Sequence, residues 1–480
     1  MGLLERLESI KKEKQAGSAK PGGGSFGAKG GPAAAPKTPV EELKSRIQDY
    51  LIRDADPNIL QQPDPEIKRT LLRAKIEEQI AVQAGDVGAT LTKKEHEILI
   101  GELIDDILGL GPIQVLLESD DISEIMVNGP NQTYMEKKGK IQLADVKFKD
   151  DEHVKLIIQK IISPLGRRCD ESMPYVDARL KDGSRVNAVI PPLALNGPTI
   201  TIRKFKKDPL KVADLIKFGS MTEDQASFLK ACVEIHRNIV VSGGTGSGKT
   251  TLLNVLSAFI SESDRIITIE DAAEIQLQQP HWVRLESKAA NVEGKGAVTM
   301  RDLIRNTLRM RPDRIIVGEC RGGETLDMLQ AMSTGHEGSL TTLHANTPID
   351  AIRRIETMVL MAGVDLPSRA IREQMAGAIH MVVQQSRLGD GSRRVMYISE
   401  SVGFDGQEVQ MKDIFKWVQT GVNAETGKFV GHVQPMKHVP TFYHKFSSNG
   451  IDIPLTFFGL TEEEGKVWLE NNPKAGKAAH

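Results

Sequence analysis

One short segment, residues 243–250, limits what this chain can fold into more than any other. It reads Gly-Gly-Thr-Gly-Ser-Gly-Lys-Thr and matches the phosphate-binding pattern G-x-x-x-x-G-K-[ST]. The apolar run 238–241 precedes it and residues 252–256 follow it, which predicts a strand, a glycine-rich turn and a helix. Such a turn aims backbone N–H groups and the positive end of the helix at an anion. The segment therefore predicts an α/β domain that binds a nucleoside triphosphate.

The residues of this turn have distinct predicted roles. Gly243, Gly246 and Gly248 let the backbone wrap a phosphate without Cβ clashes. Lys249 is expected to reach the β- and γ-phosphates, and the Thr250 hydroxyl to ligate Mg²⁺, so ATP and Mg²⁺ are the expected cofactors. The predicted nucleotide-binding set is Gly243, Gly244, Thr245, Gly246, Ser247, Gly248, Lys249, Thr250 and Thr251.

Length and composition allow several domains and argue against some classes of protein. The 480 residues exceed the ~250–300 residues that one core usually holds. A net charge of −2 and an aromatic content of 4% argue against a dedicated nucleic-acid binder. The three cysteines are scattered, which fits a reducing compartment and no zinc or disulfide framework. Because no long apolar run or signal-peptide pattern is present, we expect a cytoplasmic location.

Changes in amino-acid composition and in the spacing of apolar residues predict two N-terminal segments. Residues 1–38 combine an amphipathic stretch at 1–14 with a linker rich in glycine, alanine and proline. That stretch is either a short helix that frays or a docking or membrane-surface helix. Residues 39–111 predict a small helical bundle, because apolar residues recur with helical spacing in 40–53, 65–84 and 93–108.

Two larger domains are predicted in the rest of the chain. Residues 112–207 contain short alternating runs separated by Asp-Gly and Asn-Gly turns, with one helical run at 154–162, which indicates an α+β (PAS-like) N-terminal domain. Residues 208–480 alternate strands and helices, as expected of a parallel sheet with crossover helices.

Two further apolar strands end in carboxylates. Residues 313–319 end in Glu319, and residues 265–271 end in Glu270 and Asp271. Ligands of open α/β sheets bind at the carboxyl ends of the strands, where a carboxylate can hold the Mg²⁺ shell or polarise an attacking water. We therefore expect Glu270 and Glu319 at the nucleotide, with a solvated strand-end glutamate as the alternative for Glu319.

Residues 335–346 contain another strand-like run, with a histidine on either side of it. His336 and His344 together are expected to contact or sense the γ-phosphate, whereas each alone would more often be a structural residue. A metal site is disfavoured, because no cysteine or regular third ligand accompanies them.

These motifs, in this order, resemble those of the secretion ATPases, the superfamily that powers type II secretion, type IV pili, archaeal filaments and type IV secretion. The residues that carry the resemblance are 243–250, 269–271, 308–319 and 334–346. A narrower resemblance, to the CpaF/TadA-type motor of the tad (Flp) pilus, is carried by 168–205. It covers roughly residue 95 to the C-terminus.

The resemblance implies a RecA-like fold for residues 208–480 and a role for each motif residue. Glu319 would be the Walker B glutamate and Glu270 the acidic-box glutamate, both acting on Mg²⁺ through water, while His336 and His344 would form the histidine box. We also expect Lys249, Arg185 and Arg203 to act in catalysis. The two arginines would reach the phosphates from the N-terminal domain; without the family match, a surface ion pair explains them better.

The resemblance also implies partners and a mechanism. We expect a homohexamer at the inner membrane, peripheral through its pilus platform proteins, with residues 1–38 contacting polar-localisation or assembly factors and no nucleic acid involved. Hydrolysis would change the angle between two domains joined by the link 206–209.

Several alternatives stay open at this stage. The absence of a four-cysteine zinc module weakens a type II secretion or pilus-extension assignment and leaves the tad and type IV secretion readings. A RecA-like nucleic-acid motor and a non-hydrolysing nucleotide-binding assembly protein are less favoured. A basic cluster is expected to contact a subunit, a nucleotide or only solvent; it consists of Arg305, Arg309, Arg311 and Arg321.

Overall fold

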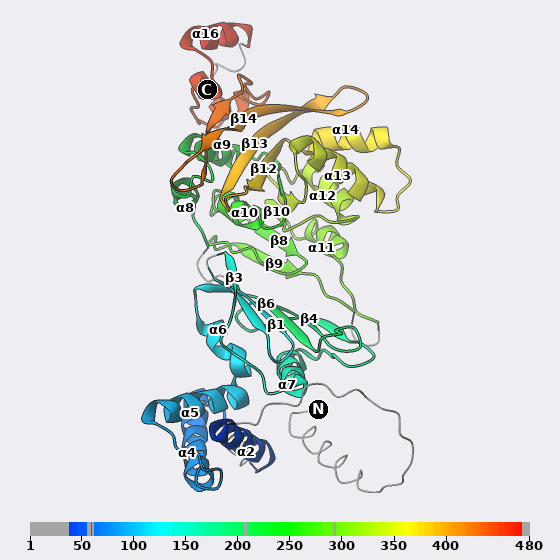
Figure 1. The fold of residues 1–480 in the computed structure, drawn as a ribbon. Helices are drawn as coiled ribbons and strands as arrows, with labels where there is room; N and C mark the ends of the chain where they lie inside the picture. Colours follow the sequence, from blue (N-terminus) through cyan, green and yellow to red (C-terminus); the bar gives the residue numbers. More distant parts are fainter. Residues whose placement is uncertain are drawn as a thin grey trace. The chain divides into compact units, whose positions relative to one another are not determined.

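The computed structural model describes residues 38–54, 59, 62–137, 139–205, 209–290 and 294–472 (Figure 1). The chain divides into two compact units, Met1–Gln114 and Val115–His480. The amphipathic stretch 1–14, most of the linker that follows it and the link residues 206–208 lie outside the described residues.

The first unit contains the three predicted helices, α2 (Pro39–Asp54), α4 (Pro65–Gln83) and α5 (Lys93–Leu108). Their starts follow from local capping: the Asp64 side chain accepts from the first backbone N–H groups of α4, and Thr92 forms a capping box with Glu95 at α5. The apolar faces meet in one core, which includes Leu43, Ile47, Leu72, Ile76, Ile100 and Leu103. The predicted helical bundle is confirmed.

The first unit ends with η1 (Gly111–Ile113), α6 (Gln114–Glu118) spans the boundary, and the second unit continues with an antiparallel six-stranded sheet. Its strand order is β3-β2-β1-β6-β5-β4, and one helix, α7 (Asp151–Ile162), contacts β4 and β6. The strands are β1 (Ile122–Asn128), β2 (Thr133–Lys137), β3 (Lys140–Leu143), β4 (Tyr175–Arg179), β5 (Arg185–Val189) and β6 (Thr199–Arg203). The described residues between Ile122 and Arg203 therefore form the α+β region expected from the sequence.

A nine-stranded sheet organises the rest of the second unit, in the order β15-β14-β13-β12-β7-β11-β10-β8-β9. The run from β12 to β9 is parallel, and β13, β14 and β15 extend it with antiparallel strands. The strands are β7 (Ile239–Gly243), β8 (Ile266–Glu270), β9 (Trp282–Glu286), β10 (Arg314–Val317), β11 (Leu340–Leu343), β12 (Met381–Arg387), β13 (Arg393–Phe404), β14 (Val409–Val422) and β15 (Phe429–Pro435).

Helices cover both faces of this sheet (Figure 1). One face packs α9 (Glu223–Glu234) and α10 (Lys249–Ser257). The other packs α11 (Met300–Thr307), α12 (Glu324–Ser333), α13 (Pro348–Leu360) and α14 (Ser368–Ala378). A parallel sheet with helices on both faces and a P-loop after a central strand is the RecA-like arrangement expected from the sequence.

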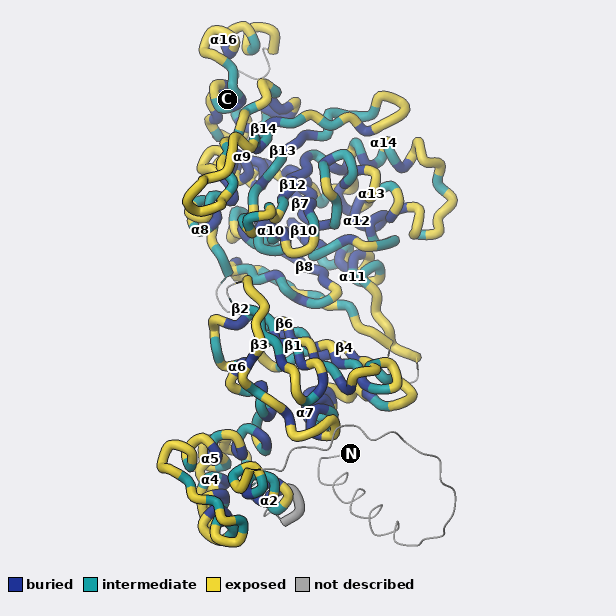
Figure 2. Tube along the Cα trace, viewed as in Figure 1, coloured by how far each residue is buried: buried dark blue, intermediate teal, exposed yellow. Residues whose placement is uncertain are grey.

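The central strand β7 is buried along its whole length, which explains why its sequence is almost uniformly apolar. Val241 points to the core on the α9 and α10 side, and Val240 to the core on the other side. The buried residues, dark blue in Figure 2, accordingly follow the central strands.

One buried amide joins the elements around β7. The Asn238 side chain donates to the carbonyls of Met332 (3.1 Å) and Ala378 (2.7 Å), and it accepts from the N–H groups of Gly338 (2.8 Å) and Ser339 (3.0 Å). Because Asn238 is fully buried, these bonds fix α12, α14 and β11 at the start of the P-loop strand.

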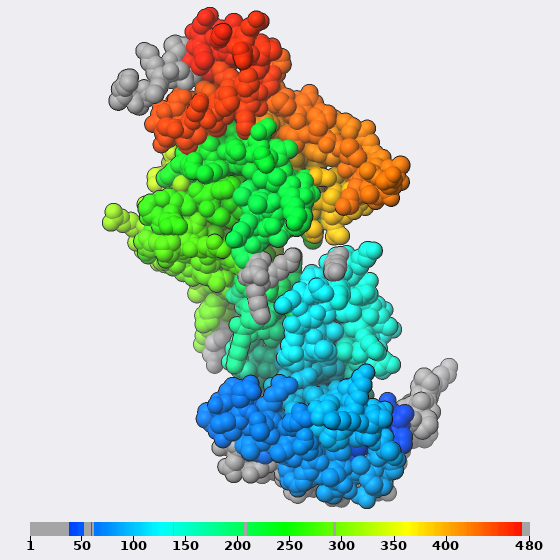
Figure 3. Space-filling model, turned by 90° about the vertical axis from the view of Figure 1, so that its left-hand side faces the viewer, coloured from blue at the N-terminus to red at the C-terminus, as the bar shows by residue number. Residues whose placement is uncertain are grey.

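The C-terminal residues fold back on the α9 side of the sheet. The short helix α15 (His444–Ser448), the turn η3 (Leu455–Phe458) and α16 (Glu462–Asn471) follow β15. The rings of Phe446 and Phe458 pack edge-on against Phe228 of α9, and in Figure 3 this red segment lies against the green residues of the domain. This apolar contact completes one of the two cores.

Candidate nucleotide site

The parallel strands bring the predicted motifs to one edge of the sheet. The P-loop follows β7, Glu270 is the last residue of β8, Glu319 follows β10, and His344 follows β11. Because these four strands are neighbours and parallel, their carboxyl ends meet at the same edge. Residues far apart in the sequence therefore lie at one edge of the sheet.

The P-loop has the conformation that its glycines were expected to allow. Gly248 has a φ of 97° and stands at the N-cap of α10, a left-handed conformation that favours glycine. At Gly243 a Cβ would lie 2.2 Å from the carbonyl oxygen of Gln385 on β12, so no side chain fits there. The loop is thus shaped by its own backbone and by the neighbouring strand.

Lys249 is buried in this site, with 8% of its surface exposed. Its Nζ donates to the Gly244 carbonyl (3.0 Å) and lies 3.3 Å from Nδ1 of His344. Burial lowers the pKa of Lys249, and the charges of Arg321 and Arg203 add to this while Glu319 opposes it. The ammonium group therefore contacts both the loop and the histidine that follows β11.

Glu319 lies between a guanidinium and an imidazole. Its Oε2 accepts from Nε (2.8 Å) and Nη2 (2.6 Å) of Arg321, and its Oε1 lies 2.9 Å from Nε2 of His344. Burial and Lys249 lower the pKa of His344, which favours the neutral ring. An ammonium group can only donate, so the neutral ring with its proton on Nε2 can accept from Lys249 through Nδ1. Although it lies near the ring, Oε1 of Glu319 has no hydrogen-bond partner among the described residues.

Glu270 is more deeply buried, at 3% exposure. Its Oε1 accepts from the backbone N–H groups of Glu274 (2.7 Å) and Ile275 (2.9 Å), whereas Oε2 has no hydrogen-bond partner among the described residues. Burial raises the pKa of Glu270 to about 7. Gly318 makes room for this side chain, because a Cβ there would lie 2.8 Å from Cγ of Glu270.

The oxygen ligands at this edge fit a magnesium ion. Thr250, at the start of α10, supplies a hydroxyl, and Glu270 has an unpartnered carboxylate oxygen. Hard cations such as Mg²⁺ prefer such oxygens together with water and phosphate. No group of three or more His, Cys, Asp or Glu side chains in the described part of the chain could hold a metal by itself. Thr250, with Glu270 and Glu319 through water, would hold the ion, which would neutralise phosphate charge when bound.

The two arginines expected from the N-terminal domain have different surroundings. Arg185 Nη1 donates to Oε1 of Glu274 (2.5 Å), in the loop that also binds Glu270. The Arg203 side chain is 61% exposed and lies 3.7 Å from Glu124, and its charge contributes to the lowered pKa of Lys249 after burial. Arg185 is therefore paired with a carboxylate of the loop after β8, and Arg203 is mostly exposed.

Sequence reasoning missed a third arginine, Arg179. Its guanidinium donates to the Ala273 carbonyl and to the Glu286 carboxylate. Together with Arg185 it links β4 and β5 to the loop after β8. The strand pairing Arg179↔Arg185 places the two side by side, and the Asp182-Gly183 turn between them is the sequence signal that indicates this hairpin.

The structure does not bring His336 to the P-loop. His336 precedes β11 and His344 follows it, and β11 runs parallel to β7 with Leu340 beside Ile239. His336 therefore lies at the end of the sheet opposite to the site, because an extended strand separates the two histidines. Their expected joint contact with the γ-phosphate is wrong for His336 in this conformation.

The basic cluster expected from the sequence also separates. Arg321 contacts Glu319 in the site, whereas Arg305 donates to the buried carboxylate of Asp327 (2.7 Å) between α11 and α12. Arg305 thus pairs with a carboxylate away from the P-loop, and Arg321 pairs with Glu319.

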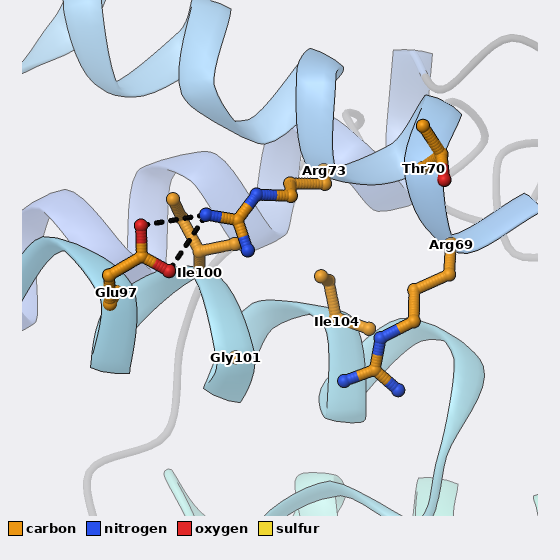
Figure 4. Close-up of a pocket in the computed structure, with 7 residues that line it drawn as sticks. All are labelled: Arg69, Thr70, Arg73, Glu97, Ile100, Gly101 and Ile104. Atoms are coloured by element: carbon orange, nitrogen blue, oxygen red, sulfur yellow. Dashed lines mark hydrogen bonds and ion pairs between the residues drawn. The ribbon is translucent and has the colours of Figure 1, made fainter. Parts of the chain in front are cut away.

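A different pocket lies in the helical unit, between α4 and α5 (Figure 4), and has a volume of about 350 Å³. Arg73 donates to both carboxylate oxygens of Glu97 (2.7 Å each) at one side, and Ile100 and Ile104 form an apolar wall. No phosphate-binding loop borders it, so we do not assign the nucleotide to it.

The fold and the site together define a RecA-like P-loop domain built to bind a nucleotide at the carboxyl edge of its sheet. Residues 106–415 match the family model described as "Type II/IV secretion system protein". The chain belongs to this family of secretion ATPases.

The chain is also similar to several named proteins. The conjugal transfer protein TrbB of Rhizobium radiobacter is 34% identical over 321 residues, covering 66% of this chain and 94% of the relative. The type IV secretion system protein VirB11 of Brucella abortus is 33% identical over 319 residues, covering 61% and 88%. The solved VirB11 ATPase of Brucella suis, in complex with sulphate, is 29% identical, covers 60% of this chain and 95% of that one, and aligns with a TM-score of 0.33.

The described helices contain no segment that is both long and apolar enough to cross a membrane.

Proposed function

We propose that this chain is an ATP-hydrolysing motor of a pilus or secretion machine. The observation that carries the proposal is the meeting of Lys249, Glu270 and Glu319 at one edge of the sheet, with His344 between the lysine and Glu319. These groups supply a phosphate-binding cation, a buried carboxylate and a candidate general base, which are the parts that phosphoryl transfer to water requires.

Nucleotide binding would exchange contacts that the site now makes with itself. Phosphate oxygens would replace the Gly244 carbonyl as acceptor for Lys249, and Arg321 would have a second anion to contact besides Glu319. Glu319 would then be free to accept a proton from the attacking water. At the same time the oxygen of this water would bond to the γ-phosphorus, and the bond between the γ-phosphorus and ADP would break. His344 would orient the carboxylate during this step.

The buried glutamate has a separate role in this proposal. Glu270, with a pKa of about 7 and a free Oε2, would orient water at the metal side of the nucleotide. Arg185 and Arg203 would add positive charge from the N-terminal α+β region as it closes on the phosphates. We propose that the working form is a homohexamer, cytoplasmic and bound to the inner membrane through platform proteins.

Two machines are candidates for the motor. The motifs at residues 168–205 resemble the CpaF/TadA type, which supports a motor for assembly of a tad (Flp) pilus, with its retraction left open. The names of relatives at 33–34% identity, a conjugal transfer protein and a type IV secretion system protein, favour type IV secretion instead. A strain carrying Lys249→Ala should lose surface pili in the first case and transfer of DNA or protein in the second, as seen by electron microscopy and by mating or secretion assays.

Phosphate release by the purified full chain tests the activity itself. Lys249→Ala should abolish nucleotide binding and hydrolysis, and Glu319→Gln should bind ATP but hydrolyse it about 100-fold more slowly or less. Lys466→Ala and Glu463→Gln, two exposed residues of α16, are matched controls that should behave as wild type. Wild-type turnover in Glu319→Gln would refute the role of Glu319.

A further inference from the structure

The strand β12 lies beside the P-loop strand on the side away from β11. Its pairing with β7 places Gln384 beside Ser242 and Gln385 beside Gly243. The chain beyond Gln385 therefore runs along the phosphate-binding loop before it turns into β13. This hairpin carries none of the motifs that predicted the site from the sequence.

The first contact from this hairpin is a buried amide. Gln385 is 2% exposed, and its Nε2 lies 3.4 Å from the point that a Cβ on Gly248 would occupy. Its Oε1 is buried and has no hydrogen-bond partner within the described ranges. A buried, unpartnered amide oxygen is costly, so its place against the loop calls for a functional reason.

The second contact comes from Arg393, the first residue of β13. Its Nε donates to the Gly246 carbonyl (2.9 Å), and its Cδ lies 3.2 Å from the Cβ position of Gly248. The C=O and N–H of one peptide point in opposite directions. Holding the Gly246 carbonyl toward Arg393 therefore turns the N–H of Ser247 the other way, to the Gly244 carbonyl, to which it donates (3.3 Å).

A second guanidinium stands nearby. Arg387, the last residue of β12, has its Nη1 3.8 Å from the Cβ position of Gly246. Burial lowers the pKa of Arg393, and the charge of Arg387 adds to that effect. Two arginines this close repel each other unless an anion is present, which makes an adjacent phosphate favourable.

We propose that Gln385, Arg387 and Arg393 form a loop support that holds the P-loop in its phosphate-binding conformation. Arg393 is a positioning residue that acts through Gly246, and Arg387 supplies charge that favours a triphosphate over a diphosphate. This inference rests on the proposed nucleotide binding at the P-loop. A loop rich in glycine loses much conformational freedom when it is fixed, so contacts that fix it beforehand increase affinity.

The test uses the full chain, a fluorescent ATP analogue and steady-state phosphate release. Arg393→Ala should raise the Kd for the analogue and the KM for ATP about tenfold, with kcat changed by less than about twofold, because it removes one charge-assisted hydrogen bond. Arg393→Lys should recover part of the affinity, since an ammonium group can still donate to the carbonyl. Arg353→Ala, at an arginine that is 63% exposed on α13, is the control and should match wild type.

Arg387→Ala tests the charge. It should weaken the binding of ATP more than that of ADP, because ATP brings one more phosphate. Equal losses for both nucleotides would contradict the charge role of Arg387. Since Arg387 is exposed, this variant should stay folded, which a melting curve checks.

Lys249→Ala, measured in parallel, separates this inference from the proposed function. If Lys249→Ala leaves the affinity for the analogue unchanged, nucleotide binding at the P-loop itself is wrong. If Lys249→Ala abolishes binding while Arg393→Ala keeps Kd and KM within about twofold of wild type, the loop support is wrong and the nucleotide site stands.

Discussion

Nε2 of His344 lies 2.9 Å from Oε1 of Glu319. The imidazole joins the end of β11 to the end of β10, and its other nitrogen faces the P-loop lysine at 3.3 Å. A change in what the lysine contacts can therefore be transmitted through one ring to the carboxylate proposed to activate water.

Replacing this histidine should affect hydrolysis more than binding. In His344→Ala the ring that orients Glu319 is lost, and we expect kcat to fall about 10- to 100-fold while the Kd for ATP changes little. Phosphate release and titration with a fluorescent ATP analogue measure the two quantities. His336→Ala is the matched control, because that histidine lies at the other end of β11, and an equal loss of kcat in both variants would contradict the assignment.

Glu270 should make the stability of the fold depend on pH. Its pKa rises from an ordinary value of 4.5 to about 7 on burial, so the folded state prefers the protonated form. The stabilisation is complete below about pH 4.5 and is lost as pH rises toward 7, by about 3 kcal/mol in all. Glu270→Gln, which stays neutral, should remove this dependence while abolishing efficient hydrolysis.

Urea unfolding of both proteins at pH 5 and pH 8 measures the effect. The difference in unfolding free energy between Glu270→Gln and wild type should be larger at pH 8. If this difference in unfolding free energy is the same at pH 5 and pH 8, burial does not raise the pKa of Glu270.

A methyl group at Gly318 should displace the same glutamate. The new Cβ would lie 2.8 Å from Cγ of Glu270, so Gly318→Ala forces the carboxylate or the strand to move, at a cost of about 1–3 kcal/mol. We expect a lower melting temperature and slower hydrolysis. Gly377→Ala in α14 meets open space and should be neutral or slightly stabilising.

Substituting the two partners of the Arg185–Glu274 ion pair one at a time distinguishes a role of Arg185 in catalysis from a role in holding the loop after β8. If Arg185 reaches phosphate when nucleotide binds, Arg185→Ala should reduce kcat/KM at least about tenfold, whereas Glu274→Ala should reduce it far less. The partly exposed pair itself should contribute only about 0.5 kcal/mol to folding. Equal losses of kcat/KM in the two variants would mean that Arg185 acts only by holding the loop after β8.

Asn238 should be one of the most sensitive positions for stability. Asn238→Leu removes four buried hydrogen bonds and leaves two carbonyls and two N–H groups unpaired, which should cost at least about 3 kcal/mol. Thermal and urea unfolding measure the loss. Asn449→Ala, at an exposed position, is the control, and comparable stability of the two variants would contradict the proposed role of the buried amide.

Much of the fold follows from local patterns in the sequence. The helices of the first unit and the strands around Asp182-Gly183 and Asn196-Gly197 were predicted nearly to their ends, because capping and turn residues act over a few positions. The P-loop, Glu270 and Glu319 were predictable because each follows an apolar strand, and parallel strands share an edge.

What the sequence did not predict depends on which strands become neighbours. The pairing of β12 with β7 places Gln385, Arg387 and Arg393 against the P-loop, although they lie far from it in the sequence. The prediction for His336 failed for a related reason. His336 and His344 are close in the sequence, which suggested a shared site, but β11 lies between them and holds them at opposite ends of the strand.

The close approach of Gly243 to the Gln385 carbonyl has a consequence for how this chain tolerates change. The obstacle to a side chain at residue 243 is the backbone of β12, which is the same whatever residue occupies position 385. No compensating substitution at 385 can therefore rescue a larger residue at 243. The first glycine of the motif is required by the packing of two strands, and a protein that never met a nucleotide would need it just as much.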